Sequence, residues 1–206
     1  MNEPVKWLPD ADNTGWKGLG DALRAGLPVP AGFIVCRATP EYEARTAYEK
    51  LKLREKTHFV AVRGSTHAVL NVIGPDALVH TLRRLWLETS DAPILVQRMI
   101  HSMWCGKTQQ DGPNLTIKVN EGMLLLDPDT YMVNGDSGQC IRQMLEPKQR
   151  KMIRHVDGSA RVVERTSPRA PIPAELLVKV AQLGPGVGWA IDDLEKIWLL
   201  ACDREK

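Results

Sequence analysis

The chain has 206 residues, with 27 Lys and Arg against 25 Asp and Glu, which gives a formal net charge of +2. So small a balance gives no argument for a nucleic-acid or membrane partner, because both carry dense negative charge. Hydrophobic residues make up 43% of the chain and charged residues 25%, which excludes a disordered chain and a coiled-coil rod. At roughly 150 residues per domain, the length fits one compact domain or two small ones.

The four cysteines, Cys36, Cys105, Cys140 and Cys202, lie far apart and form no CxxC pair. Disulfide frameworks and zinc sites normally cluster their cysteines, so we expect reduced thiols and no zinc site. Residues 1–13 are polar and lack the apolar core of a signal peptide. No apolar run reaches the length that crosses a bilayer. These features predict a cytoplasmic protein without a membrane-spanning segment.

The first half of the chain mixes predicted helices with short apolar strands, after an irregular lead-in over residues 1–14. Leu19, Leu23 and Leu27 recur every four residues and share one helical face, and Gly26 suits the C-cap of that helix. Thr39 is the predicted N-cap of a second helix, which has Pro40 at its first position and ends near Arg54. The apolar pattern predicts a further helix over residues 75–88 and strands over residues 33–35, 58–63 and 93–100.

The second half is rich in predicted strands. Asn134-Gly135 and Asp157-Gly158 are hairpin turn signals. A helix is predicted over residues 174–183, and a closing hairpin over residues 186–202 with its turn at residues 192–195. The other predicted strands are residues 115–119, 122–126, 130–133 and 139–145. Because helices and antiparallel strands do not alternate as βαβ units, the order favours an α+β fold with two lobes, residues 1–90 and 91–206.

Two basic residues stand in contexts that suit a phosphate. The loop GWKGLG carries Lys17 just before the first helix, where backbone N–H groups can approach an anion. Arg63 ends the apolar strand VAVR and can bind a phosphate through two parallel hydrogen bonds. A flexible turn and an exposed arginine at a strand end are the alternatives for these two features. The basic stretch over residues 141–169 has no aromatic residue for base stacking, so a solvated face is favoured there.

Taken in order, six segments resemble the ATP-binding domain of the pyruvate phosphate dikinase and phosphoenolpyruvate synthase family. They are GWKGLGDALRAGLPVPAGFIV, VAVRGST, ILVQRMI, DPDTYMV, LEPKQRKMI and WAIDDLEKIWLLACDRE. The resemblance implies an ATP-grasp fold, in which two α+β lobes with mixed or antiparallel sheets clamp a nucleotide. It also implies that Lys17 and Arg63 hold the ATP phosphates, and that Gln97, Arg98 and Met99 lie along the adenine.

Several positions depart from the family pattern. Gly186 and Gly188 stand where the family has the aspartate and glutamate that hold the bridging metal. Ala201 and Asp203 replace the family's glutamine and arginine, Lys118 replaces a glutamate, and the phosphate-covering loop after Ser65 is missing. A Mg²⁺ site needs carboxylate oxygens, so we expect neither a metal ligand nor a catalytic residue from the matching positions. Asp192, Asp193 and Asp203 are candidate substitutes that the sequence does not place.

Three interpretations remain. The first is a reduced, stand-alone ATP-grasp domain that binds ATP or another adenine nucleotide but is catalytically degenerate. The second is an active phosphotransferase that acts on a separate acceptor, such as a phosphohistidine-domain protein, since the sequence shows no such domain of its own. The third is an interaction protein that no longer binds nucleotide. The negative charge of Asp203 predicts that affinity falls with each added phosphate when no metal is present.

Overall fold

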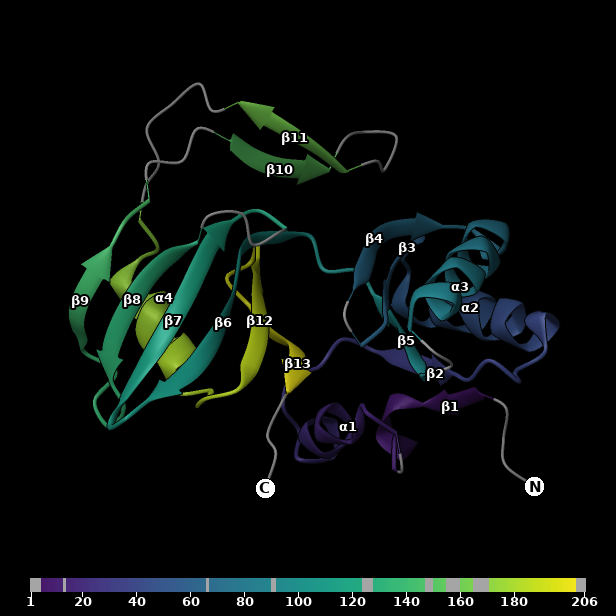
Figure 1. The fold of residues 1–206 in the computed structure, drawn as a ribbon, viewed down its shortest axis with the longest axis horizontal. Coiled ribbons are helices and arrows are strands. Elements are labelled where there is room, and N and C mark those ends of the chain that lie inside the picture. Colours follow the sequence, from purple (N-terminus) through teal and green to yellow (C-terminus); the bar gives the residue numbers. More distant parts are fainter. Residues whose placement is uncertain are drawn as a thin grey trace. The chain divides into compact units, whose positions relative to one another are not determined.

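The computed structural model describes residues 5–12, 14–65, 67–89, 92–123, 128–146, 150–154, 160–164 and 171–202. These residues form α-helices and antiparallel sheets, which confirms the predicted α+β class (Figure 1). The chain divides into two compact units. Of the described residues, unit 1 holds those through Met99 together with Ala160, and unit 2 holds the others from Ile100 onward. The strand β5 (Ile94–Arg98) pairs with two strands of unit 1 and so belongs to its sheet, while the lobe boundary near Ser90 stays a prediction.

Unit 1 is built on a five-stranded sheet with the order β1-β2-β5-β3-β4. Every neighbouring pair in this sheet is antiparallel. Besides β5, its strands are β1 (Val5–Trp7), β2 (Gly32–Val35), β3 (Phe59–Arg63) and β4 (Ala68–Ile73). All four residues of β2 are buried, so this strand is covered on both faces.

Helices cover the two faces of this sheet. The helices α2 (Glu41–Glu55) and α3 (Pro75–Thr89) pack on the face that carries Phe33, Val62 and Val96 (Figure 1). The short helix η1 (Leu8–Asp10) and α1 (Lys17–Arg24) lie on the opposite face. Gly32 marks this face, because a Cβ built on it would lie 3.3 Å from Leu8 Cδ1. Gly20 of α1 lies directly against Leu8, where a Cβ would come within 2.7 Å of the Leu8 carbonyl oxygen.

Unit 2 is built on a six-stranded sheet with the order β13-β12-β6-β7-β8-β9, again antiparallel throughout. One face packs against α4 (Ala174–Ala181), and its core contains Ile117, Tyr131 and Trp189. The strands are β6 (Ser102–Asp111), β7 (Asn114–Glu121), β8 (Asp129–Asn134), β9 (Cys140–Met144), β12 (Val187–Asp192) and β13 (Ile197–Cys202). A separate two-stranded sheet pairs β10 (Arg150–Arg154) with β11 (Ala160–Glu164).

Most predicted elements are confirmed. The predicted first helix ends at Arg24, and Gly26 has the left-handed φ of +79° that its C-cap assignment implies. The closing hairpin is present, and Trp189 and Trp198 lie on its paired strands, opposite Leu199 and Ala190. The turn predicted at Asp157-Gly158 and the end of the strand predicted over residues 122–126 lie outside the described residues.

Two predictions are wrong, and some strands are not predicted. The lead-in is not irregular, because β1 adds a short edge strand there that pairs with β2. The N-cap of α2 is Pro40, because the Thr39 hydroxyl accepts a hydrogen bond from the Cys36 N–H at 3.1 Å instead. The strands β4, β6, β10 and β11 are not predicted at all. In β6 the positions that face the core include Gly106 and Thr108, so the strand shows no apolar alternation. No helix in the described part of the chain is long and apolar enough to cross a membrane.

Candidate functional site

Lys17 is the first residue of α1, and its ammonium group is already engaged. Lys17 Nζ lies 2.7 Å from Asp21 Oδ2, one helical turn further along, and both side chains are about half exposed. Arg24 also bonds Asp21. The hydrogen bond from Lys17 and then the one from Arg24 lower the pKa of the Asp21 carboxyl below its ordinary value. A ligand that binds Lys17 therefore competes with this ion pair.

Arg63 and Gln97 lie on the same face of the unit 1 sheet. Arg63 is directly opposite Leu95, and Gln97 is directly opposite Ala61. Directly opposed residues of an antiparallel pair project from the same face, and residues two apart on a strand do so as well. Gln97 is also opposite Gly32, which marks the face covered by η1 and α1. The sheet therefore brings Arg63 and Gln97 to the face on which α1 and Lys17 lie.

Gln97 is fully buried and its amide is partly used by the fold. Its Nε2 donates to the Pro30 carbonyl at 3.0 Å, while its Oε1 has no hydrogen-bond partner among the described residues. The fixed amide ties β5 to the segment that leads into β2. The side chain of Gln97 thus helps to hold the strand β5 beside the segment before β2. Its contact with adenine stays a prediction.

Arg98 does not join this group. It lies opposite Val60, whose side chain belongs to the core that α2 and α3 cover, so Arg98 projects from the other face. Its guanidinium group lies 3.4 Å from Glu55 at the end of α2. The backbone N–H groups of Arg98 and Met99 donate to Ala31 and Phe59. These two N–H groups already donate hydrogen bonds within unit 1 and are not available to adenine. Adenine recognition by residues 97–99 therefore also stays a prediction.

Gly186 and Gly188, the two glycines that the sequence resemblance matches to metal ligands, have distinct environments in unit 2. Gly186 has a φ of +68°, a conformation that residues with a side chain adopt much less readily than glycine, and its N–H donates to the Thr108 carbonyl at 3.0 Å. Gly188 lies opposite Ala201 and Lys107, and a Cβ on it would lie 3.1 Å from Ala201 Cβ. The positive φ of the first glycine and the small space beside the second thus both favour glycine over a larger residue. Asp203 lies outside the described residues.

Asp192 is occupied by the turn of the closing hairpin. One carboxylate oxygen accepts the N–H groups of Leu194 at 3.0 Å and Lys196 at 2.9 Å. The other accepts the indole N–H of Trp198 at 2.8 Å. Lys196 Nζ lies 3.8 Å from the centre of the Trp198 ring. In the described part of the chain, no group of three or more His, Cys, Asp or Glu could hold a metal ion.

The sequence analysis does not identify two polar residues of these sheets, Asn71 and Lys107. Asn71 lies at a bulge of β4 with a φ of +58°, and both polar atoms of its buried side chain have no hydrogen-bond partner in the described residues. An isolated asparagine between apolar residues gave no signal for this conformation. Lys107 was also missed, because the strand that carries it was not predicted, although Lys118 on the next strand was singled out.

Among solved structures, the chain is similar to the D-alanine-D-alanine ligase from Coxiella burnetii. The sequence identity is 11% and the TM-score 0.47, over 88% of this chain and 44% of that one. The chain therefore spans less than half of the length of that ligase. No protein-family model matches the chain, and no curated protein is significantly similar to it. The function must accordingly be argued from the chain's own residues.

Proposed function

We propose that this chain is an ATP-grasp-type domain that binds an adenine nucleotide and is catalytically degenerate. In this proposal, units 1 and 2 are the two lobes, related to those of the pyruvate phosphate dikinase and phosphoenolpyruvate synthase family. The order of the six motifs supports the relationship, together with an antiparallel sheet in each unit. The retained Lys17 and Arg63 support nucleotide binding.

One observation carries the proposal. Arg63 ends β3 on the sheet face where α1 and Lys17 lie. An arginine at a strand end presents a planar guanidinium group that can bind a phosphate through two parallel hydrogen bonds. Lys17 adds a point charge at the start of the helix, where the helix dipole also favours an anion.

The loss of catalysis follows from what the matching positions contain. Phosphoryl transfer needs a metal ion that neutralises the charge on the β- and γ-phosphates. Gly186 and Gly188 offer no ligand oxygen from a side chain, and both oxygens of Asp192 accept hydrogen bonds, one from the turn and the other from the indole of Trp198. Removal of such electrostatic stabilisation costs a factor of roughly 10²–10³ in rate for a single donor. We therefore expect binding without turnover.

A thermal-shift titration with AMP, ADP and ATP, each with Mg²⁺ and with EDTA, tests this function. A ligand at 100 times its Kd adds about 2.7 kcal/mol of stability, which is easily detected. Calorimetry then compares Arg63→Ala with Arg45→Ala. Arg45 is a matched control because it pairs with Asp76, a residue of α3, through an exposed ion pair. We expect the first variant alone to weaken nucleotide binding.

The other outcomes are equally informative. Magnesium-dependent ATP turnover would overturn the degenerate assignment and support an active phosphotransferase that uses a separate acceptor. The absence of any nucleotide effect would overturn nucleotide binding and support an interaction protein.

A further inference from the structure

A hollow of about 370 Å³ lies in unit 1 between the strand β1 and the helix α2. Val5 and Trp7 form its β1 side, and both pack against the core that α2 covers, so their side chains project towards the helix. On the α2 side, Ala47 contributes only a methyl group. The volume is within the range of roughly 300–1,000 Å³ that ligand sites in proteins occupy.

The hollow lies beside an open edge of the sheet. In the described part of the chain, β1 is a terminal strand and pairs with β2 alone. The described residues that line the hollow all belong to β1 or α2, so the hollow is on the side of β1 away from β2. An edge strand presents unpaired backbone N–H and C=O groups. An extended segment that pairs with them directs every second side chain to the face towards α2.

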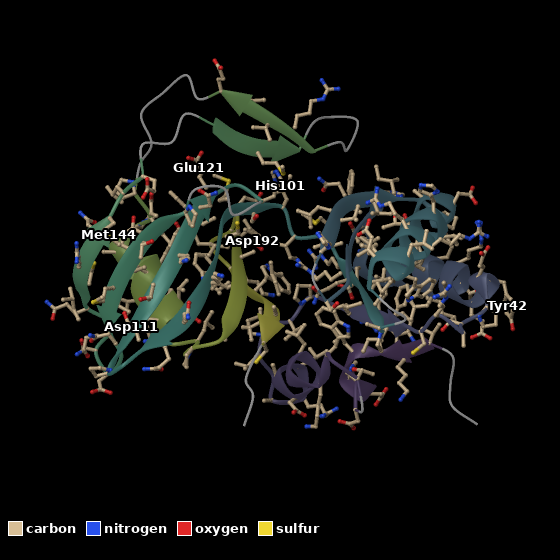
Figure 2. The ribbon with its side chains drawn as sticks, in the orientation of Figure 1. Tyr42, His101, Asp111, Glu121, Met144 and Asp192 are labelled. Carbon is tan, nitrogen blue, oxygen red and sulfur yellow. The ribbon has the colours of Figure 1, made fainter. Side chains whose placement is uncertain are left out.

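Two aromatic side chains flank the hollow. The ring of Trp7 is held in place, because its centroid lies 5.6 Å from that of Phe33 and 5.2 Å from the guanidinium carbon of Arg54. Tyr42 lies at the surface of unit 1 with 67% of its area exposed (Figure 2). Its hydroxyl donates to Glu43 Oε1 at 3.0 Å. Aromatic rings bury a large apolar area when a partner covers them, so the hollow favours an apolar group between these two rings.

The hollow carries opposite charges at its two ends. Glu43 and Lys50 both line it, and they are seven residues apart on α2, which is nearly two full turns and about 10 Å along the helix axis. Lys50 is exposed and has no hydrogen bond or ion pair with a described residue. None of the residues three or four positions from it on α2 is acidic. Lys6, between the two β1 residues that line the hollow, projects from the other face of the sheet.

We propose that this hollow and the open edge of β1 bind an extended segment of a partner protein that has a basic, an apolar and an acidic residue at alternate positions. The basic residue pairs with Glu43, the apolar residue lies between Trp7 and Ala47, and the acidic residue pairs with Lys50. Residues four apart on a strand are about 13 Å apart, and flexible side chains at both ends adjust this span to the charges on α2. This inference concerns unit 1 alone and does not depend on nucleotide binding.

Fluorescence anisotropy with the full chain tests this inference. The probe is the peptide Thr-Thr-Lys-Thr-Leu-Thr-Glu-Thr-Thr, with fluorescein at its amino end and an amide at its carboxyl end. We expect saturable binding in the absence of nucleotide. A scrambled peptide of the same composition, in which lysine and glutamate are adjacent, is the control for the alternate spacing and should bind at least tenfold more weakly.

Variants of the chain assign the contacts. Lys50→Glu weakens binding about five- to tenfold, because an exposed attraction becomes a repulsion. A second peptide with lysine in place of its glutamate restores binding to this variant. Tyr42→Ala weakens binding of the first peptide, whereas Tyr42→Phe, which keeps the ring, does not. Lys179→Glu makes the same change in charge on α4 of unit 2 and leaves binding unchanged, since Lys179 does not line the hollow. Urea denaturation verifies that each variant is folded.

The outcomes are decisive for this surface. No saturable binding of the first peptide, or equal binding of the scrambled peptide, would overturn the inference. Binding that is unchanged in Lys50→Glu, or that the second peptide does not restore, would also overturn it. Neither result affects the nucleotide titrations, so the failure of this inference and the failure of the proposed function are distinguishable.

Discussion

The carboxylate of Asp192 either stabilises the closing hairpin through its hydrogen bonds or is available to bind a metal ion. Its three hydrogen bonds join the turn to the indole of Trp198, whose side chain is 8% exposed. In Asp192→Ala the two turn N–H groups regain water, but the indole N–H loses a charged acceptor. A hydrogen bond to a charged group contributes about 1.5–3 kcal/mol, so we expect a loss of about 2–3 kcal/mol in the free energy of unfolding.

The variant Asp192→Asn separates the two halves of this network. Its amide oxygen can still accept the turn N–H groups of residues 194 and 196, but its NH₂ group then faces the indole N–H of Trp198, and two donors cannot bond. We expect a loss between that of the alanine variant and zero, measured by urea denaturation with tryptophan fluorescence. Asp193→Asn is the control, since Asp193 is the exposed neighbour in the same turn.

The same variants test the metal question. We expect Mg²⁺ alone to leave the stability of the wild type unchanged, because one oxygen of Asp192 already accepts from the turn and the other from the indole of Trp198. If Asp192→Asn were as stable as Asp193→Asn, or if it abolished a stabilisation of the wild type by Mg²⁺, the structural assignment of this carboxylate would be refuted.

Three further predictions follow from local geometry. Lys17→Ala raises the pKa of Asp21 towards its ordinary value, which NMR titration measures. Because the pKa is lowered in the folded chain, the ion pair stabilises the fold at neutral pH. This contribution is lost as Asp21 is protonated below about pH 4. Gly106→Ala lowers the free energy of unfolding by about 1–3 kcal/mol in denaturant unfolding, because the new Cβ would clash with the ring of buried Trp189. A stability equal to that of the wild type would contradict this packing. Gly186→Ala costs about 1–2 kcal/mol because of its φ of +68°, and an unchanged urea midpoint would show that the backbone relaxes.

The sequence predicted elements wherever local chemistry and apolar pattern agree. Leu78, Leu82 and Leu85 recur at helical spacing and are buried on α3. Phe33 to Val35 form a continuous apolar run and become a fully buried strand. Asn134-Gly135 carries both a turn residue and a glycine, and it closes the turn between β8 and β9. These signals are short-range, so no tertiary information was needed to find them.

Elements that tertiary packing defines were not visible in the sequence. Thr108 on β6 is buried because its hydroxyl bonds Gly184 and Val187, which are far away in the chain. Gly106 is needed because Trp189 of β12 lies against it. Neither residue is apolar, so the strand carries no hydrophobic period that a sequence pattern could detect.

For the candidate site, the sequence by itself determined which residues stand at the positions that the resemblance singles out: Lys17 and Arg63, and glycines at residues 186 and 188. Only the tertiary structure decided how these residues group. Strand register puts Arg63 with Gln97 and turns Arg98 to the other face, and it sets Lys107 opposite Lys118. The physical reason is that a shift of one residue in pairing reverses the face of every side chain, and pairing depends on contacts between distant segments.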